Sequence, residues 1–357
     1  MSQNANEIIN HFKPKKIIYP ILIGLGVASF LLFRNFDKEA FAAIHWTTST
    51  SFWIFMALVM VAVRDLAYMY RIKVLTDYTL SWMSCFNIIF LWEFASALAP
   101  PILGGGFAFA IFIINGEKIK MGKSISVVLF TSFLDGLFFA LVAPFVYFIA
   151  GKENLFSGIN ISQQMMFGKE LFVYFWFIYF VVLIYKLFVA YALFINARAI
   201  KWALIKLFSF PILRRWRQRA RQTGDELMIA SKELKNQNLS YWLKSIGATF
   251  ASWTARFILI NCLIMAFSET YSNHFILYGR QVVMGIINIG TPTPGGSGVA
   301  ELMFTNFLGE FIPKGLSASL ALLWRLISYY PYLFIGVIIL PRWLKKMYGK
   351  TQSFVSN

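Results

Sequence analysis

The sequence predicts an all-α polytopic membrane protein with about six full spans and two broken or re-entrant hairpins. Of its 357 residues, 58% are hydrophobic and 14% are charged, whereas soluble domains are about half apolar and a quarter charged. Apolar runs of roughly 20 residues recur along the chain, and a helix needs about that length to cross some 30 Å of hydrocarbon. The runs lack the alternation of barrel strands, so only helices satisfy the backbone.

The distribution of basic residues predicts the domain boundaries and the topology. Lysine and arginine gather before residue 17, at 71–73, at 118–123, at 198–235 and after residue 340, and such segments stay in the cytoplasm. We expect a cytoplasmic N-terminal tail at 1–16, a transmembrane domain at 17–340 with a basic cytoplasmic loop at 196–240, and a cytoplasmic C-terminal tail at 341–357. The expected location is the bacterial inner (plasma) membrane.

The apolar runs are the expected helices, and they are unequal in length. In chain order they are 17–33, 52–70, 78–98, 102–114, 124–150, 171–195, 241–267, 275–289, 299–308 and 316–340. The first is long for a signal core, so an uncleaved signal anchor is favoured over a cleaved signal peptide. The runs 102–114 and 299–308 are too short to cross. Residues 78–114 are therefore expected to enter from the cytoplasmic side and return, and 275–308 to do so from outside, as an inverted repeat would produce.

A cluster of proline and glycine interrupts each predicted hairpin. The residues singled out are Pro101, Gly104, Gly105 and Gly106 in the first break, and Pro294, Gly295, Gly296 and Gly298 in the second. Neither cluster can form continuous helix, and unpaired backbone at membrane depth is tolerated where it is buried or lines a wet cavity. Helices that restart near Phe107 and Val299 would direct their N-terminal amides at the gap, where an anion such as phosphate fits. The alternative is a pair of simple kinks.

Ionisable residues lie within the spans or beside the breaks. They are Arg64, Asp65, Glu93, Asp135, Arg256, Glu301 and Arg325. Each costs about 2.5–3.5 kcal/mol at the centre of a span, so we expect them to face inward. Glu301 and Arg325 are expected to meet, either at a substrate or as a purely structural salt bridge. Arg64 and Asp65 are adjacent and do not share a helix face, so one of them is expected near the membrane surface.

Several classes of function are excluded or disfavoured. No glycine-rich run is followed by Lys-Ser or Lys-Thr, so ATP is not expected to bind, and no nucleophile elbow is present. The three histidines and two cysteines are scattered, and we expect no metal, no cofactor and no catalytic residue. The basic residues responsible for the net charge of +17 lie in short segments between apolar runs. This position favours anionic lipid headgroups over nucleic acid as their binding partner. The basic stretch 214–233 is either an amphipathic surface helix or a solvated loop.

The second break and the span after it carry a resemblance to a known family. The stretch TPTPGGSGVAELMF followed by KGLSASLALLWRLISYYPYLFIG resembles the lysylphosphatidylglycerol synthase transmembrane family, the flippase-like domain of multiple peptide resistance factor. Pro101, the glycines 104–106 and Asp135 resemble its first half, and the similarity covers roughly residues 15–345. The resemblance implies a helical flippase-like domain at 17–340 that moves aminoacylated phosphatidylglycerol between leaflets. Family members often place charged residues where this sequence has Gly-Gly-Gly-Phe-Ala-Phe.

The leading hypothesis is a non-enzymatic flippase for an anionic or aminoacylated phospholipid or lipid-linked molecule. In it, Arg64, Arg256 and Arg325 engage the headgroup phosphate. The family's bifunctional members have a soluble synthase domain after the membrane part, and here 17 residues, 341–357, follow the last expected span, so we expect no synthesis of lysyl-lipid. Two alternatives stay open: a membrane enzyme with Glu301 or Asp135 as acid or base, and a scaffold for a separate synthase bound through the basic loop. A homodimer is also left open.

Overall fold

The computed structural model describes residues 46–99, 106–156, 171–209, 214, 217–235, 237–268 and 273–352. Within these ranges the chain forms helices and no strand, which confirms the predicted all-α class. The expected run 17–33 and residues 100–105 of the first break, with Pro101, Gly104 and Gly105, lie outside the described residues.

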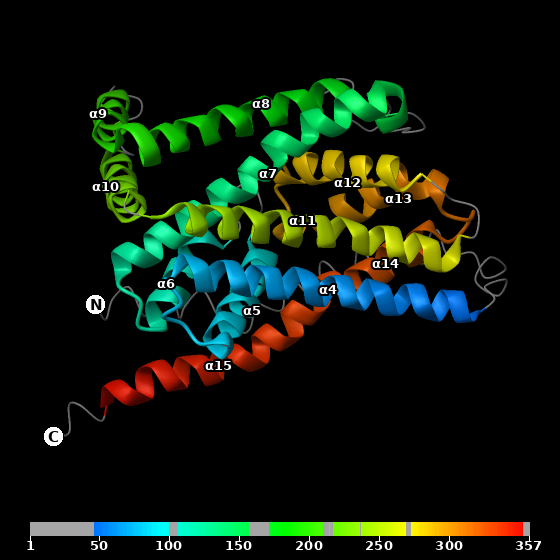
Figure 1. Cartoon of the computed structure of the whole chain (residues 1–357), viewed down its shortest axis with the longest axis horizontal. Helices are drawn as coiled ribbons and strands as arrows, with labels where there is room; N and C mark the ends of the chain where they lie inside the picture. Colours follow the sequence, from blue (N-terminus) through cyan, green and yellow to red (C-terminus); the bar gives the residue numbers. More distant parts are fainter. Residues whose placement is uncertain are drawn as a thin grey trace.

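Long apolar helices form the body of the molecule. In the described part of the chain, five segments are long and apolar enough to cross a membrane: Thr48–Leu75, Met121–Phe156, Leu171–Ile195, Leu239–Phe267 and Ser317–Met347. The first, second and fourth are α4, α7 and α11, and the third is α8 (Leu171–Ala190) with a π-helical turn, Tyr191–Ile195. In Figure 1, α4 and α11 run side by side, α7 crosses at a slant and α8 lies at the upper edge. Each corresponds to a predicted span.

Two pairs of short helices form the predicted broken hairpins. The first pair is α5 (Trp82–Leu98) with α6 (Phe107–Gly116), and the second is α12 (His274–Ile289) with α13 (Val299–Leu308). Figure 1 places the first pair in the left half of the molecule and the second in the right half. Their tips meet, because the amide of Gly295 donates to the carbonyl of Ala99 at 3.3 Å. The two hairpins therefore enter from opposite ends, while their origin in an inverted repeat stays a prediction.

The last predicted span is divided into two helices. The run 316–340 was expected to be one helix, and the structure forms α14 (Ser317–Ser328) and α15 (Tyr330–Gln352) with Tyr329 between them at φ −131° and ψ −56°. Pro331 explains the break, because it has no amide to donate to the carbonyl of Ile327 and its ring would clash with that carbonyl in a continuous helix, whereas proline is tolerated in the first turn of a new helix. Helix α15 also extends into the predicted C-terminal tail.

The basic segment 196–240 is helical where it is described. It forms α9 (Ala197–Leu207) and α10 (Arg217–Leu234), both seen end-on at the left of Figure 1. Leu227, Ala230 and Leu234 of α10 are buried, and α10 packs against α7 and α9. The described part is thus a docked helical pair and not a solvated loop. Burial raises the pKa of Glu226 on α10.

The apolar core consists of two large clusters. One gathers side chains of α5, α6, α10, α15 and the first part of α7. The other gathers side chains of α12, α13, α14, the later part of α7 and the second half of α11. Helices α7 and α11 contribute to both clusters.

Candidate functional site

The second break depends on glycine for its shape. Gly295, Gly296 and Gly298 have φ angles of +57°, +68° and +84°, a region that other residues rarely adopt. A Cβ on Gly295 would also lie 2.6 Å from Cε2 of Tyr329. Pro294 opens the short 3-10 turn Pro294–Gly296. Conformation and close packing both require glycine here, as the sequence predicted.

Gly298, the residue just before α13, does not offer the expected anion seat. The amide of Gly298 donates to Oε2 of Glu301 at 2.7 Å, so the carboxylate of Glu301 caps its own helix. A carboxylate at this position satisfies both the free amides and the positive end of the helix dipole. The Gly298 amide therefore does not point at an open gap, as was expected for this helix start, because its acceptor comes from the same helix.

Glu301 and Arg325 form the predicted ion pair, and both side chains are buried. Oε1 of Glu301 lies 2.8 Å from Nε of Arg325, and the two side chains are 3% and 6% exposed. Arg325 also donates to the carbonyl of Gly295 at 3.4 Å, and its guanidinium lies 4.5 Å from the ring centre of Tyr329. Neither charged side chain lines a described cavity. The geometry favours the structural alternative, in which this pair holds the second break against α14.

Arg64 and Asp65 are buried together, against the expectation that one lies near the membrane surface. Nε of Arg64 donates to Oδ1 of Asp65 at 3.0 Å, and the hydroxyl of Tyr332 donates to Oδ2 of Asp65 at 2.6 Å. The Arg64 side chain is 1% exposed. The argument from helix faces failed because a long arginine side chain bends round to its neighbour's carboxylate. Arg64 lies outside both cavities described below.

A charged cavity of about 320 Å³ lies among α4, α5, α7 and α11. It is lined by two arginines, two carboxylates and a mixture of aromatic and hydroxyl side chains: Tyr68, Arg71, Ile89, Trp92, Glu93, Ser96, Phe107, Thr131, Ser132, Asp135, Trp253 and Arg256. Phe107 is the first residue of α6, and Gly106 before it has φ +76° and packs against the backbone of Ser96. The N-terminal, positive end of α6 therefore lies at the cavity wall.

Two ion pairs cross this charged cavity. Nη1 of Arg71 lies 2.6 Å from Oδ1 of Asp135, and Nη2 of Arg256 lies 3.0 Å from Oε1 of Glu93. The indole of Trp253 donates to Oδ1 of Asp135 at 2.9 Å. Asp135, Glu93 and Arg256 are 28–30% exposed, so a ligand in the cavity has access to them. The structure thus brings together Asp135 and Arg256, two of the predicted site residues, from α7 and α11.

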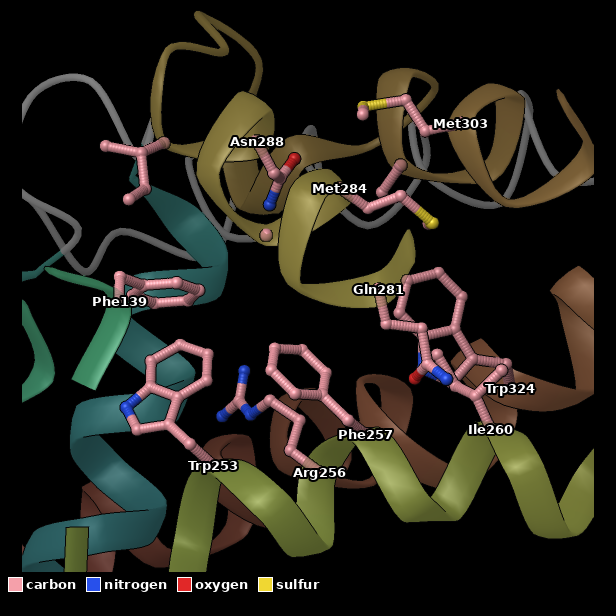
Figure 2. Close-up of a pocket in the computed structure, with 13 residues that line it drawn as sticks. Phe139, Trp253, Arg256, Phe257, Ile260, Gln281, Met284, Asn288, Met303 and Trp324 are labelled. Atoms are coloured by element: carbon pink, nitrogen blue, oxygen red, sulfur yellow. The ribbon is translucent and has the colours of Figure 1, made fainter. Parts of the chain in front are cut away.

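An apolar cavity of about 260 Å³ adjoins the charged one. Its lining is mostly aromatic, aliphatic and methionine side chains: Phe139, Trp253, Arg256, Phe257, Ile260, Gln281, Met284, Gly285, Asn288, Ile289, Ala300, Met303 and Trp324. Figure 2 shows Trp253 and Arg256 rising from α11 toward Phe139 of α7 and Met284 of α12. Trp253 and Arg256 line both cavities, and the guanidinium lies 5.0 Å from the centre of the indole. This pair forms the wall between the two cavities.

The sequence analysis did not predict two cationic side chains in or beside the charged cavity. Arg71 was assigned to a cytoplasmic basic segment, yet it is 3% exposed and points into the charged cavity. Lys186 was overlooked in the apolar run 171–195, yet its ammonium donates to Oγ of Ser132 at 2.8 Å. A lone lysine in an otherwise apolar span was the available signal. In the described part of the chain, no three His, Cys or carboxylate side chains converge as a metal site requires.

The arrangement defines a class: a polytopic helical membrane protein with paired charges and an apolar chamber inside. The chain belongs to the family described as the lysylphosphatidylglycerol synthase TM region, whose model matches residues 17–336. The second break, Glu301 and Arg325, on which the resemblance rested, lie within the matched range. This confirms the family expectation.

Two relatives from archaea are similar along most of their length. A UPF0104 membrane protein of Archaeoglobus fulgidus is 25% identical over 303 residues, which is 81% of this chain and 82% of the relative. A UPF0104 membrane protein of Methanocaldococcus jannaschii is 23% identical over 348 residues, 94% of this chain and 98% of the relative. No solved structure matches the chain significantly.

Proposed function

We propose that the protein moves a phospholipid or lipid-linked molecule between the leaflets of a membrane, without making or breaking a covalent bond. The observation that carries the proposal is the contact between a charged cavity and an apolar cavity across Trp253 and Arg256. A lipid has the same two parts, a charged headgroup and an apolar chain. The headgroup occupies the charged cavity, and a segment of acyl chain occupies the apolar one.

The ion pairs of the charged cavity provide a way to bind a phosphate without an unpaired charge. In the empty site Glu93 neutralises Arg256, and Asp135 neutralises Arg71. A phosphate oxygen takes the place of one carboxylate on its arginine, and arginine binds phosphate well because its donors form a planar fork. The released carboxylate is partly exposed and stays hydrated. The exchange of partners keeps the cost of charge in a membrane low at each step.

The family match supports a role in lipid handling, and the charge distribution supports an orientation. We place the protein in the plasma membrane, with the end that carries α9, α10 and the start of α7 in the cytoplasm, because lysine and arginine are retained there. Broken hairpins that meet at the middle of the fold are the parts that move in this proposal. Binding of a separate synthase and formation of a homodimer stay predictions from the sequence.

The test is lipid exchange by the purified protein in vesicles that contain a phospholipid with a fluorescent acyl chain. We expect wild-type protein to bring the inner-leaflet lipid to an external quencher faster than empty vesicles do. Arg256→Gln should abolish this exchange, whereas Arg221→Gln, which changes an exposed arginine of α10, should leave it unchanged. Equal rates in wild-type and empty vesicles would exclude the proposed activity.

A further inference from the structure

Lys186 differs from the other cations inside the fold. Arg64, Arg71, Arg256, Arg280 and Arg325 each lie within ion-pair distance of a carboxylate. Among the described residues, no carboxylate lies within 4 Å of the Lys186 ammonium; its acceptors are the carbonyl and the hydroxyl of Ser132, at 2.6 and 2.8 Å. A lysine at this depth costs free energy, so it is expected to serve a purpose.

The path of the Lys186 side chain is built into α7. The chain passes over Gly136, where a Cβ would lie 2.6 Å from both Cγ and Cδ of Lys186. The ammonium then reaches Ser132, whose side chain lines the charged cavity one helical turn before Asp135. Lys186 therefore approaches the cavity from α8, whereas Arg71 and Arg256 come from α4 and α11.

The charges around the cavity do not cancel once Lys186 is counted. Arg71 and Arg256 balance Asp135 and Glu93 within the lining. Lys186, behind Ser132 and close enough for the Asp135 carboxylate to act on it electrostatically, adds one positive charge. A site in a low-dielectric interior with one surplus positive charge favours a ligand with one net negative charge.

We propose that Lys186 is the residue that makes the charged cavity selective for a lipid whose headgroup carries one net negative charge, a phosphodiester without a compensating cation. This rests on the proposed lipid function and deepens it by naming the headgroup class. The phosphate takes Arg256 from Glu93, and the surplus charge of Lys186 balances the charge that the lipid brings. A zwitterionic headgroup leaves that surplus unbalanced and binds less well.

The experiment compares binding of dioleoylphosphatidylglycerol and dioleoylphosphatidylcholine to the full chain in detergent, by native mass spectrometry. We expect the wild type to prefer the anionic lipid by about tenfold or more, given one charge at a short distance in a poorly polarisable interior. Lys186→Met should remove the preference and Lys186→Arg should keep it. Lys152→Met, which changes an exposed lysine outside both cavities, is the matched control and should keep it.

Asp135→Asn provides an independent arm, because it raises the net charge by one and should increase the preference for the anionic lipid. This arm decides the matter if Lys186→Met does not fold. Unchanged preference in both variants, with lipid still bound, would overturn the role of Lys186 and leave the lipid function standing. Absence of any bound lipid in the wild type would overturn both. Displacement of the lipid by an equal concentration of glycerophosphoglycerol, its headgroup without acyl chains, would overturn the assignment to a lipid.

Discussion

Two ion pairs inside this fold each join a glutamate to an arginine, and they differ in how far they are exposed to a cavity. Glu301 and Arg325 are 3% and 6% exposed and hold the second break to α14. Glu93 and Arg256 are 28% and 30% exposed and line a cavity. The sealed pair has no space beside it for a ligand, whereas the open pair can change partners. Exposure to a cavity, and not the presence of charge within a span, separates the pair that we propose to bind a ligand from the pair that holds the fold together.

The largest effect is expected when the sealed pair is broken. Glu301→Gln leaves the guanidinium of Arg325 buried without its counter-charge and should lower the stability by about 3–5 kcal/mol. Thermal unfolding of the detergent-purified protein measures this. The double variant Glu301→Gln with Arg325→Met removes both charges and should recover part of the loss. A single variant as stable as the wild type would show that this pair is not structural.

A smaller loss of stability is expected at Gly295, in the same sealed region. Gly295→Ala places a side chain in a left-handed conformation, at a cost of about 1–2 kcal/mol, and forces it against Tyr329. Gly247→Ala is the matched control, since Gly247 lies in α11 and a Cβ added there would meet no atom within 4 Å. That change should stabilise the helix by about 0.5–1 kcal/mol. Similar melting shifts in both variants would contradict the required backbone shape.

The open pair should tolerate the substitution that the sealed pair does not. Glu93→Gln should change the stability by less than about 1 kcal/mol, because both partners are partly exposed. It should also strengthen binding of an anionic phospholipid, since Arg256 loses its competing carboxylate. Lipid binding and thermal unfolding measured on the same preparation check both effects. Severe destabilisation by this variant would erase the distinction between the two pairs.

The smallest effect is expected outside both regions, at Glu226 of α10. Its pKa is raised by burial, so the folded state binds the proton more tightly than the unfolded state. The contribution to stability is then present below the unfolded pKa and is lost as the pH rises through the folded pKa. Glu226→Gln should be slightly more stable than the wild type at neutral pH and equal to it in acid. Thermal unfolding at several pH values checks this sign.

Composition and periodicity predicted the long helices that the structure describes, except for the division of the last span, and they predicted both breaks. Proline and glycine dictate the breaks chemically, so the positions of Gly295, Gly296 and Gly298 followed from the sequence alone. The pairing of Glu301 with Arg325 was also predictable, because buried opposite charges at similar depth in consecutive segments have few other partners. These features depend on local chemistry or on short separations along the chain.

Which residues line the charged cavity could not be predicted from the sequence alone. Arg71 lies near the end of a span, where a basic residue ordinarily indicates topology, and only the packing of α4 against α11 turns it inward. Lys186 was hidden by the high hydropathy of its span. The last span is interrupted at Tyr329 because Pro331 cannot continue the helical hydrogen bonding, a signal that was present in the sequence and was not used. The cavities themselves arise where distant helices fail to fill space.

The hydrogen bond from Gly295 to Ala99 joins the tips of two hairpins that arrive from opposite surfaces. The hydroxyl of Tyr329, at the junction of α14 and α15, donates to the carbonyl of Ala97 at 3.1 Å and so ties that junction to the first tip. A displacement of one tip that keeps these links intact is transmitted to the other. The two hairpins are thus joined at their tips, and we expect a rearrangement of one hairpin to be felt by the other.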